Sequence, residues 1–256
     1  MVPGIGWLTA FLDMPAQSFE VGTAFWESVT GCTASPLRGS SGQFATLLPP
    51  QGDAYLRVQR TDEGQGGCHM DVHVERGRIA EVVQYAVSLG ASTCPATPGR
   101  VGRTVSSPGG FLFLVGAHEG EGERPRPQAW RAAHRSLVDQ LCLDVPPSSF
   151  DSEASFWAAF TGWERRPGFR PEFAYLQRPS AIPLRLLFQR LDDGDAQGVR
   201  AHLDIACDDI AAEVERHVAL GATPVRAMPD WTTLRSPVGQ EYCVTRRDPG
   251  TGTLPS

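Results

Sequence analysis

Apolar and polar residues alternate along residues 201–207, which is the pattern of a β-strand with one buried face. The same pattern recurs more weakly in the segment 68–90. In both segments a histidine and an aspartate stand two residues apart, so they share the polar face of the strand. These residues are His69 and Asp71 in the first segment, and His202 and Asp204 in the second.

An amphipathic helix is expected directly after the strand at 201–207. Ile210, Val214 and Val218 recur at helical spacing and predict its buried apolar stripe. Either Asp208 or Asp209 can cap the start of this helix.

The chain repeats itself at a constant spacing. LTAFLDMPAQSFEVGTAFWESVTG begins at Leu8, and DQLCLDVPPSSFDSEASFWAAFTG begins at Asp139. Matching positions that are too numerous for chance indicate a tandem duplication. They include Asp13 with Asp144, Pro15 with Pro146, Phe19 with Phe150, Trp26 with Trp157, and Gly31 with Gly162.

Each copy predicts the order strand, helix and three strands, twice over, which gives four βαβββ modules. Ser18 and Ser149 can cap the first helix of each copy, and Gly31 and Gly162 stand where a helix-ending glycine belongs.

The repeat also predicts the domain boundaries. We expect a first domain over residues 1–117, an exposed linker over 118–136, a second domain over 137–248, and a disordered tail over 249–256.

Composition excludes several classes of function. A net charge of -6 argues against a nucleic-acid partner. All 23 basic residues are arginine, which excludes a lysine Schiff base. The six cysteines form no CxxC pair, and no apolar run approaches the roughly 18 residues of a membrane span. We therefore expect reduced thiols, a cytoplasmic location and no membrane partner.

The repeated βαβββ unit and the run HLDIACDD…LGA…LRSPVGQEYCV resemble the vicinal oxygen chelate superfamily over Leu8 to Thr245. This superfamily includes glyoxalase I, extradiol dioxygenases and bleomycin resistance proteins, and the chain looks most like bacterial glyoxalase-like domain proteins. The resemblance implies an α+β fold of two glyoxalase-like domains, with half-open barrels of mostly antiparallel strands and flanking helices. It also implies an internal pseudo-dimer, and hence a monomer or a weak homodimer.

Enzymes of the superfamily usually hold a divalent metal with histidine and glutamate ligands. Carried over to this chain, the ligand positions fall at His69, Thr9, Leu114 and Arg57 in the first copy, and at His202, Gln140, Cys243 and Leu187 in the second. No metal is therefore favoured, because three protein ligands are the usual minimum. If one is bound, the resemblance implies His202, Cys243 and Gln140 as its ligands.

The polar faces of the strands predict a concave cleft that binds a small molecule. Arg57 and Arg185 are expected to pair with Asp71 and Asp204, or to bind an anionic group of the ligand. As alternatives, the histidines are ordinary structural residues and Cys243 is a packed hydrophobic residue. The predicted ligand-binding residues are His69, Asp71, Arg57, Gln59, Gln140, Arg185, Gln189, His202, Asp204 and Cys243.

Two functions follow. The favoured one is a glyoxalase or bleomycin resistance type of protein that binds a small organic ligand without a full metal site. The alternative is a metal-dependent lyase, isomerase or dioxygenase acting through the second domain. In that case His202 and Asp204 are the catalytic candidates, with Glu241 as an alternative base. Glyoxalase I activity itself is not expected.

Overall fold

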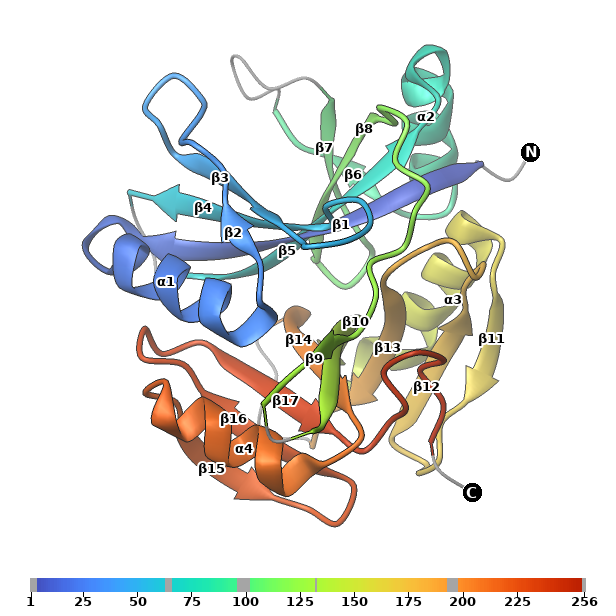
Figure 1. The fold of residues 1–256 in the computed structure, drawn as a ribbon. Helices are drawn as coiled ribbons and strands as arrows, with labels where there is room; N and C mark the ends of the chain where they lie inside the picture. The colour runs from blue at the N-terminus through green and yellow to red at the C-terminus, as the bar shows by residue number, and fades with distance from the viewer. Residues whose placement is uncertain (1–3, 63–65, 96–101, 132, 193–197, 255–256) are drawn as a thin grey trace. The chain divides into compact units, whose positions relative to one another are not determined.

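The computed structural model describes residues 4–62, 66–95, 102–131, 133–192 and 198–254. These residues form a mixed α+β fold in which each copy of the repeat builds one open sheet (Figure 1). The first sheet has the order β2-β3-β4-β1-β5-β8-β7-β6, with strands β1 (Ile5–Pro15), β2 (Thr33–Ala34), β3 (Phe44–Leu48), β4 (Leu56–Thr61), β5 (Gly67–Val74), β6 (Ser92–Thr93), β7 (Arg103–Ser106) and β8 (Leu112–Ala117).

The second sheet has the order β11-β12-β13-β10-β14-β17-β16-β15, and β9 pairs with β10 outside this path. Its strands are β9 (Gln128–Ala129), β10 (Arg135–Val145), β11 (Glu164–Pro167), β12 (Phe173–Gln177), β13 (Arg185–Arg190), β14 (Arg200–Cys207), β15 (Thr223–Ala227), β16 (Trp231–Arg235) and β17 (Glu241–Thr245).

Within the described residues, four α-helices complete the modules: α1 (Phe19–Thr30), α2 (Ile79–Ser88), α3 (Phe150–Thr161) and α4 (Ile210–Ala219). The predicted βαβββ order is confirmed four times, as β1-α1-β2-β3-β4, β5-α2-β6-β7-β8, β10-α3-β11-β12-β13 and β14-α4-β15-β16-β17. The pairs β5–β8 and β14–β17 are parallel.

The helix starts differ from one another. Asp209 caps α4, because its carboxylate accepts a hydrogen bond from the Ala212 amide at 3.0 Å. Ser18 and Ser149 do not cap α1 and α3, although both occupy the N-cap position. Each hydroxyl donates to the carbonyl three residues earlier, at 3.2 and 3.3 Å. The reason is a short 3-10 turn that leads into each helix and gives both serines a helical backbone already.

The helix ends follow the prediction. Gly31 and Gly162 terminate α1 and α3 in the left-handed region, with φ of 69° and 71°.

The apolar stripe predicted for α4 is wrong. Val218 is 44% exposed, whereas Glu213 and His217 are fully buried on this helix. The buried face is polar because partners from other segments satisfy its charged groups, as described below.

Contacts divide the chain into two compact units. Unit 1 comprises Met1–Phe11, His69–Gly122 and Cys142–Ala201, and unit 2 comprises Leu12–Cys68, Glu123–Leu141 and His202–Ser256. Each unit therefore contains segments from both copies of the repeat.

The cores of the units show how the copies combine. In unit 1, Phe113 of β8 packs against Trp157 of α3, with ring centroids 4.8 Å apart. In unit 2, Tyr242 of β17 packs against Trp26 of α1, at 5.1 Å. The corresponding helix of each copy thus buries its tryptophan against the last strand of the other copy.

Gln240, directly before β17, forms hydrogen bonds to three other segments of unit 2. Its side-chain oxygen accepts a hydrogen bond from the Trp26 ring nitrogen at 3.1 Å. Its amide nitrogen donates to the carbonyls of Asp13 and Gly67, at 3.0 and 3.2 Å. One side chain therefore holds β17, α1 and the segments around β1 and β5.

The expected linker, residues 118–136, is partly structured. Its short strand β9 pairs with β10, and His134 and Ser136 are buried. The start of the expected tail, residues 249–256, turns back on the second domain, because the Asp248 amide donates a 2.8 Å hydrogen bond to the Thr253 carbonyl. Residues 255–256 of the tail lie outside the described residues.

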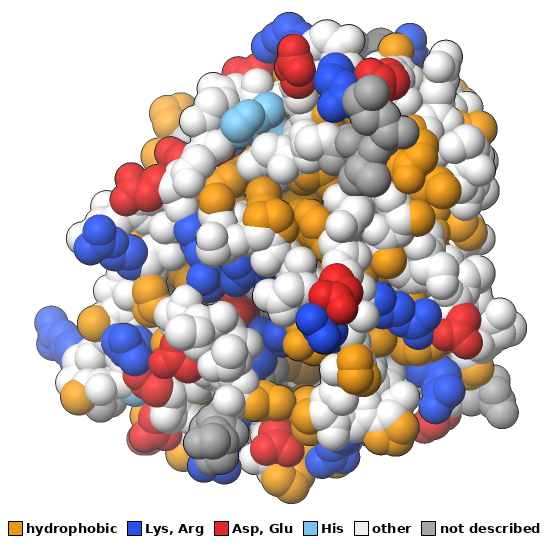
Figure 2. Space-filling view, turned by 90° about the vertical axis from the view of Figure 1, so that its right-hand side faces the viewer, with side chains coloured by type: hydrophobic (Ala, Val, Ile, Leu, Met, Phe, Trp, Pro, Cys, Tyr) orange, Lys and Arg blue, Asp and Glu red, His pale blue; other side chains and the backbone are white. Residues whose placement is uncertain are grey.

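Acidic and basic side chains are interspersed over the face drawn in Figure 2, among the residues that it colours by type. None of the helices in the described part of the chain reaches the length and apolar character that a bilayer span requires.

Candidate functional site

Three side chains with metal-binding atoms meet where β14 and β17 pair. The parallel register places Asp204 opposite Cys243, and His202 precedes Asp204 by two residues on the same face. His202 Nε2 lies 3.3 Å from Asp204 Oδ1 and 3.7 Å from Cys243 Sγ. We call these three residues, whose donor atoms all lie within 4.8 Å of one another, the His202 cluster.

Asp204 is the buried carboxylate of this cluster, with 3% of its surface exposed. The Gln140 amide nitrogen donates a hydrogen bond to Asp204 Oδ2. No aligned hydrogen-bond donor among the described residues reaches Asp204 Oδ1, the oxygen that faces His202.

The charge of Asp204 is stabilised despite its burial. Burial acts to raise the pKa of Asp204, but the contact with His202, the charge of Arg247 and the hydrogen bond from Gln140 outweigh it. The pKa is therefore held below its usual value, and the carboxylate stays ionised.

Two further contacts support the cluster from outside. Arg247 is buried and forms a two-pronged ion pair with Asp139, at 2.7 and 2.8 Å. The Thr233 hydroxyl lies 3.5 Å from Cys243 Sγ, because these residues are opposite each other in the β16–β17 register.

The equivalent position in the first copy lacks a third donor. Leu114 stands opposite Asp71 in the β5–β8 register, where the second copy has Cys243. His69 stacks on Phe11, with ring centroids 4.5 Å apart. Within the described residues, neither His69 nor Asp71 belongs to a group of three potential metal ligands in its own unit.

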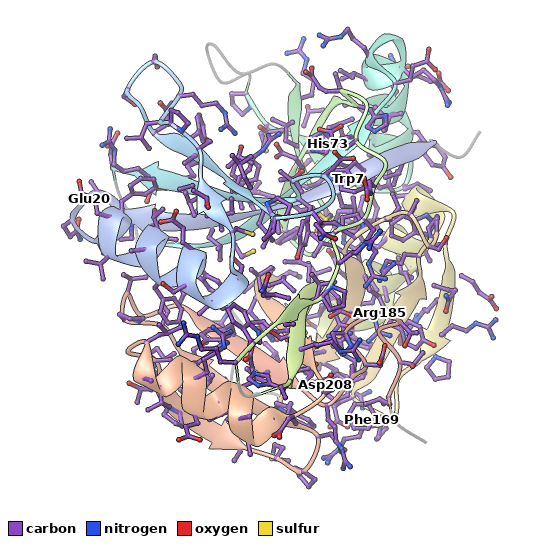
Figure 3. All side chains as sticks on the ribbon, viewed as in Figure 1. Trp7, Glu20, His73, Phe169, Arg185 and Asp208 are labelled. Atoms are coloured by element: carbon purple, nitrogen blue, oxygen red, sulfur yellow. The ribbon has the colours of Figure 1, made fainter. Side chains whose placement is uncertain are left out.

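The histidine that follows in the first copy has a structural environment. His73 lies on β5 in the same unit as Trp7, and both are labelled in Figure 3. Its ring contacts the Thr9 hydroxyl at 2.9 Å and the Ala117 carbonyl at 3.1 Å.

The remaining predicted residues are spread over both units. In unit 1, Gln189 accepts a hydrogen bond from the Cys142 thiol at 3.9 Å, and Arg185 lies over the Tyr175 ring at 4.6 Å (Figure 3). Arg57 and Gln59 are half-buried on β4 of unit 2.

The expected pairs Arg57–Asp71 and Arg185–Asp204 stay predictions, because their members belong to different units. Glu241, the alternative base, binds Arg235 at 2.7 Å in a largely exposed ion pair.

The predicted ligand set of His202, Cys243 and Gln140 stays a prediction. The structure adds Asp204 to it, because a carboxylate oxygen of Asp204 lies in the same group as the donor atoms of His202 and Cys243. Gln140 donates to that carboxylate. The strand faces predicted that His202 and Asp204 lie together, and the family resemblance placed Cys243 beside His202. Neither indicated that Asp204 and Cys243 stand opposite each other in the β14–β17 register.

A second polar group, which sequence reasoning missed, surrounds the buried Glu213. The carboxylate accepts hydrogen bonds from Arg216 at 2.8 and 2.9 Å, and His134 Nε2 lies 2.7 Å from it. His217 contacts the same carboxylate and lies 2.9 Å from the Tyr242 hydroxyl. We call these five residues the Glu213 network, and the spacing of its helical members at i, i+3 and i+4 could have revealed it.

Arg216 extends the Glu213 network to other segments of unit 2. It donates to the Ser28 and Val29 carbonyls in the last turn of α1, at 2.9 and 2.8 Å. It also lies 3.5 Å over the Trp130 ring. This arrangement is a structural clamp, because its ionisable centre, Glu213, is fully buried.

A small cavity lies elsewhere in unit 2, lined by Val29, Tyr55 and Ile205 among others. Its volume of about 20 Å³ suits one water molecule rather than an organic ligand.

Comparison with known proteins shows the family to which the chain belongs. The profile of the glyoxalase-like domain matches residues 9–116 and again residues 140–245. The chain belongs to the glyoxalase-like domain family. Its two glyoxalase-like copies confirm the resemblance to tandem vicinal oxygen chelate proteins.

Solved structures share the glyoxalase-like fold over nearly the whole chain. A Mn(II)-bound glyoxalase from Novosphingobium aromaticivorans has a TM-score of 0.67 at 17% identity, covering 100% of this chain and 89% of its own. The 2,2',3-trihydroxybiphenyl 1,2-dioxygenase of Sphingomonas wittichii has a TM-score of 0.64 at 14% identity, covering 96% and 90%. The 2,3-dioxygenase LapB of a Pseudomonas species has a TM-score of 0.64 at 13% identity, covering 96% and 93%. No curated protein matches the sequence.

Proposed function

We propose that this glyoxalase-like protein holds a divalent metal ion in its second copy and uses it to activate an oxygen atom of a small organic molecule. The proposal rests on the proximity of His202, Asp204 and Cys243, whose donor atoms all lie within 4.8 Å of one another. The sequence favoured a metal-free cleft because Thr, Leu, Gln and Cys replace the usual ligands at the metal positions. The carboxylate of Asp204 completes a set of three, which favours the alternative.

The distances within the cluster fit a shared ion. Nitrogen, oxygen and sulfur ligands at about 2.0–2.3 Å from a tetrahedral zinc ion stand roughly 3.3–3.7 Å from one another. The two measured separations from His202 Nε2 are 3.3 Å to Asp204 Oδ1 and 3.7 Å to Cys243 Sγ. The donor set therefore suits a divalent cation.

One nitrogen atom takes part in both contacts. His202 Nε2 faces Asp204 and Cys243 together, although a neutral ring nitrogen carries either one proton or one lone pair. With a proton on Nε2 the ring donates to the carboxylate, and with a lone pair there it accepts from the thiol. A cation bound by all three atoms would engage both contacts and would also compensate the charge of the buried carboxylate.

The residues around the cluster have positioning roles in this proposal. Gln140 holds Asp204 Oδ2 and so leaves Oδ1 directed at the centre. His202 first, and then Arg247, lower the pKa of this carboxylate. A bound divalent ion with open positions supplies Lewis-acid polarisation of a substrate oxygen.

We propose that the first copy binds no metal, as the sequence predicted. Leu114 stands where Cys243 stands in the second copy, so His69 and Asp71 are left with two donors. In our proposal the first copy binds an organic ligand at most, and the chemistry belongs to the second copy.

Metal uptake tests the proposal. Protein without a histidine tag is stripped with chelator, exposed to Zn²⁺ or Mn²⁺, and analysed by mass spectrometry for bound metal. We expect one ion per chain, and at least about tenfold weaker binding in His202→Ala, because loss of a supporting residue alone costs about 10- to 100-fold. His69→Ala is the matched control, and it should bind metal as the wild type does.

Catechol, which offers two adjacent oxygens, tests whether the bound ion has open positions. Calorimetry should detect catechol binding to the metal-loaded wild type and not to the stripped protein. Metal uptake that is equal in wild type and His202→Ala, or catechol binding that is independent of metal, would contradict the proposal.

A further inference from the structure

We infer that Cys243 makes the proposed centre a thiolate site, which selects Zn²⁺ over Mn²⁺ and commits the protein to a reaction without electron transfer at the metal. The inference rests on the proposed function and adds the metal and the class of reaction.

The thiol of Cys243 is placed as a donor to the centre. Cys243 is 8% exposed, and its sulfur lies 3.7 Å from His202 Nε2. On the other side the Thr233 hydroxyl lies 3.5 Å from the sulfur and can donate a hydrogen bond to a thiolate. The burial of Asp204 also points to a cation here, since its Oδ1 faces the cluster, 3.3 Å from His202 Nε2, without a hydrogen bond of good geometry to the described residues.

A thiolate changes the choice of metal. Soft sulfur ligands favour Zn²⁺ and Cu⁺, whereas carboxylate and water ligands suit Mn²⁺ and Mg²⁺. The cluster combines one imidazole, one carboxylate and one thiol, which is a set that zinc accepts. It also differs from the two histidines and one carboxylate that hold the iron of oxygen-activating enzymes.

A nucleophilic role for Cys243 fits the geometry less well. A histidine that serves as a base for a thiol uses one ring nitrogen for the thiol and the other for an orienting carboxylate. Here the sulfur and the carboxylate of Asp204 both face Nε2 of His202. This is the arrangement of ligands around a common centre.

The class of reaction follows from the metal. Zinc has no redox chemistry in proteins and acts by polarising bound oxygen groups. The second copy is therefore suited to an isomerisation, elimination or hydrolysis of an oxygen-bearing small molecule, and not to ring cleavage by dioxygen.

Cobalt substitution tests the sulfur ligand directly. Stripped wild-type protein is titrated with Co²⁺ alone, and its near-ultraviolet spectrum is recorded. A sulfur-to-cobalt charge-transfer band is expected in the wild type, should be lost in Cys243→Ser, and should persist in the control Cys94→Ser. The wild-type spectrum requires no variant, so it remains informative even if a substitution disturbs folding.

Competition between Zn²⁺ and Mn²⁺ tests selectivity. In Cys243→Asp, which exchanges the thiol for a carboxylate, the ratio of zinc to manganese affinity should fall by at least about tenfold. Cobalt that binds without the charge-transfer band, or an unchanged ratio in Cys243→Asp, would overturn this inference and leave the proposed function standing. A wild-type protein that binds none of the three metals overturns both.

Discussion

Glu213 shows what a single buried charge requires of its surroundings. Burial acts to raise the pKa of Glu213, but its contacts with Arg216 and His217 outweigh this effect and hold the pKa well below its usual value. For His217, burial lowers the pKa even though Glu213 acts in the opposite direction. The network is therefore built around an ionised carboxylate and a neutral imidazole.

We expect Glu213→Gln to lower the free energy of unfolding by about 3 kcal/mol near neutral pH, because it removes the only carboxylate that pairs with the part-buried Arg216 among the described residues. The loss should be measured by urea unfolding. Asp208→Asn is the control, since Asp208 forms a more exposed pair with Arg135 at the start of β10 (Figure 3) and should cost less than about 1 kcal/mol.

The same variant should change the pH dependence of stability. A carboxyl whose folded pKa is lowered stabilises the protein fully above its unfolded value of about 4.3, and this contribution is lost as the pH falls further. The wild type should therefore lose stability more steeply than Glu213→Gln below about pH 4.3. Parallel losses in both proteins would contradict the assigned role of Glu213.

At the scale of elements, the sequence predicted the order of strands and helices and the side-chain faces of the strands, but not how the strands pair. Alternation along 201–207 placed His202 and Asp204 on one face, because side-chain direction follows from local geometry alone. The position of Cys243 opposite Asp204 depends on a pairing between strands separated by a whole helix and two strands. No local pattern encodes that pairing. Cys243 and Gln140 were expected beside His202 only from the family resemblance, which did not indicate Asp204 as a ligand.

The helices show the same limit. The spacing of Val214 and Val218 favoured an apolar buried stripe on α4, yet the helix buries Glu213 and His217. Arg216 of the same helix pairs with Glu213, and the remaining partners come from β17 and the segment before β10. The helical sequence alone cannot show that His134 and Tyr242, from other segments, will meet these side chains.

Helix capping gives a test at this scale. We expect Asp209→Ala to destabilise the protein by about 1 kcal/mol, because the substitution removes the carboxylate that accepts from the Ala212 amide. Ser149→Ala should be close to neutral, since the Ser149 hydroxyl makes no such bond. Equal losses in urea unfolding would show that the two helix starts do not differ as described.

At the scale of the whole chain, sheets follow the copies but compact units do not. The duplication predicted two sheets of equal construction, and each copy builds one. Trp26 of the first copy is nevertheless buried against Tyr242 of the second, and Trp157 against Phe113. Repetition in a sequence reveals modules, but not which modules share a core.

Separating the two copies tests whether each needs the other to cover its tryptophan. Fragments 1–122 and 123–256 should each fail to show a cooperative thermal transition, because each loses the strand that covers its tryptophan. Co-expression should restore a complex that elutes as one species. Two fragments that each unfold cooperatively on their own would contradict the prediction.

Gln240 lies three residues before Cys243, and it grips the first copy at the Trp26 ring and at two backbone carbonyls. A substitution at Trp26 is therefore expected to reach the strand that carries Cys243, although the two residues belong to different copies. The first copy in this way fixes the start of the strand on which the proposed centre depends.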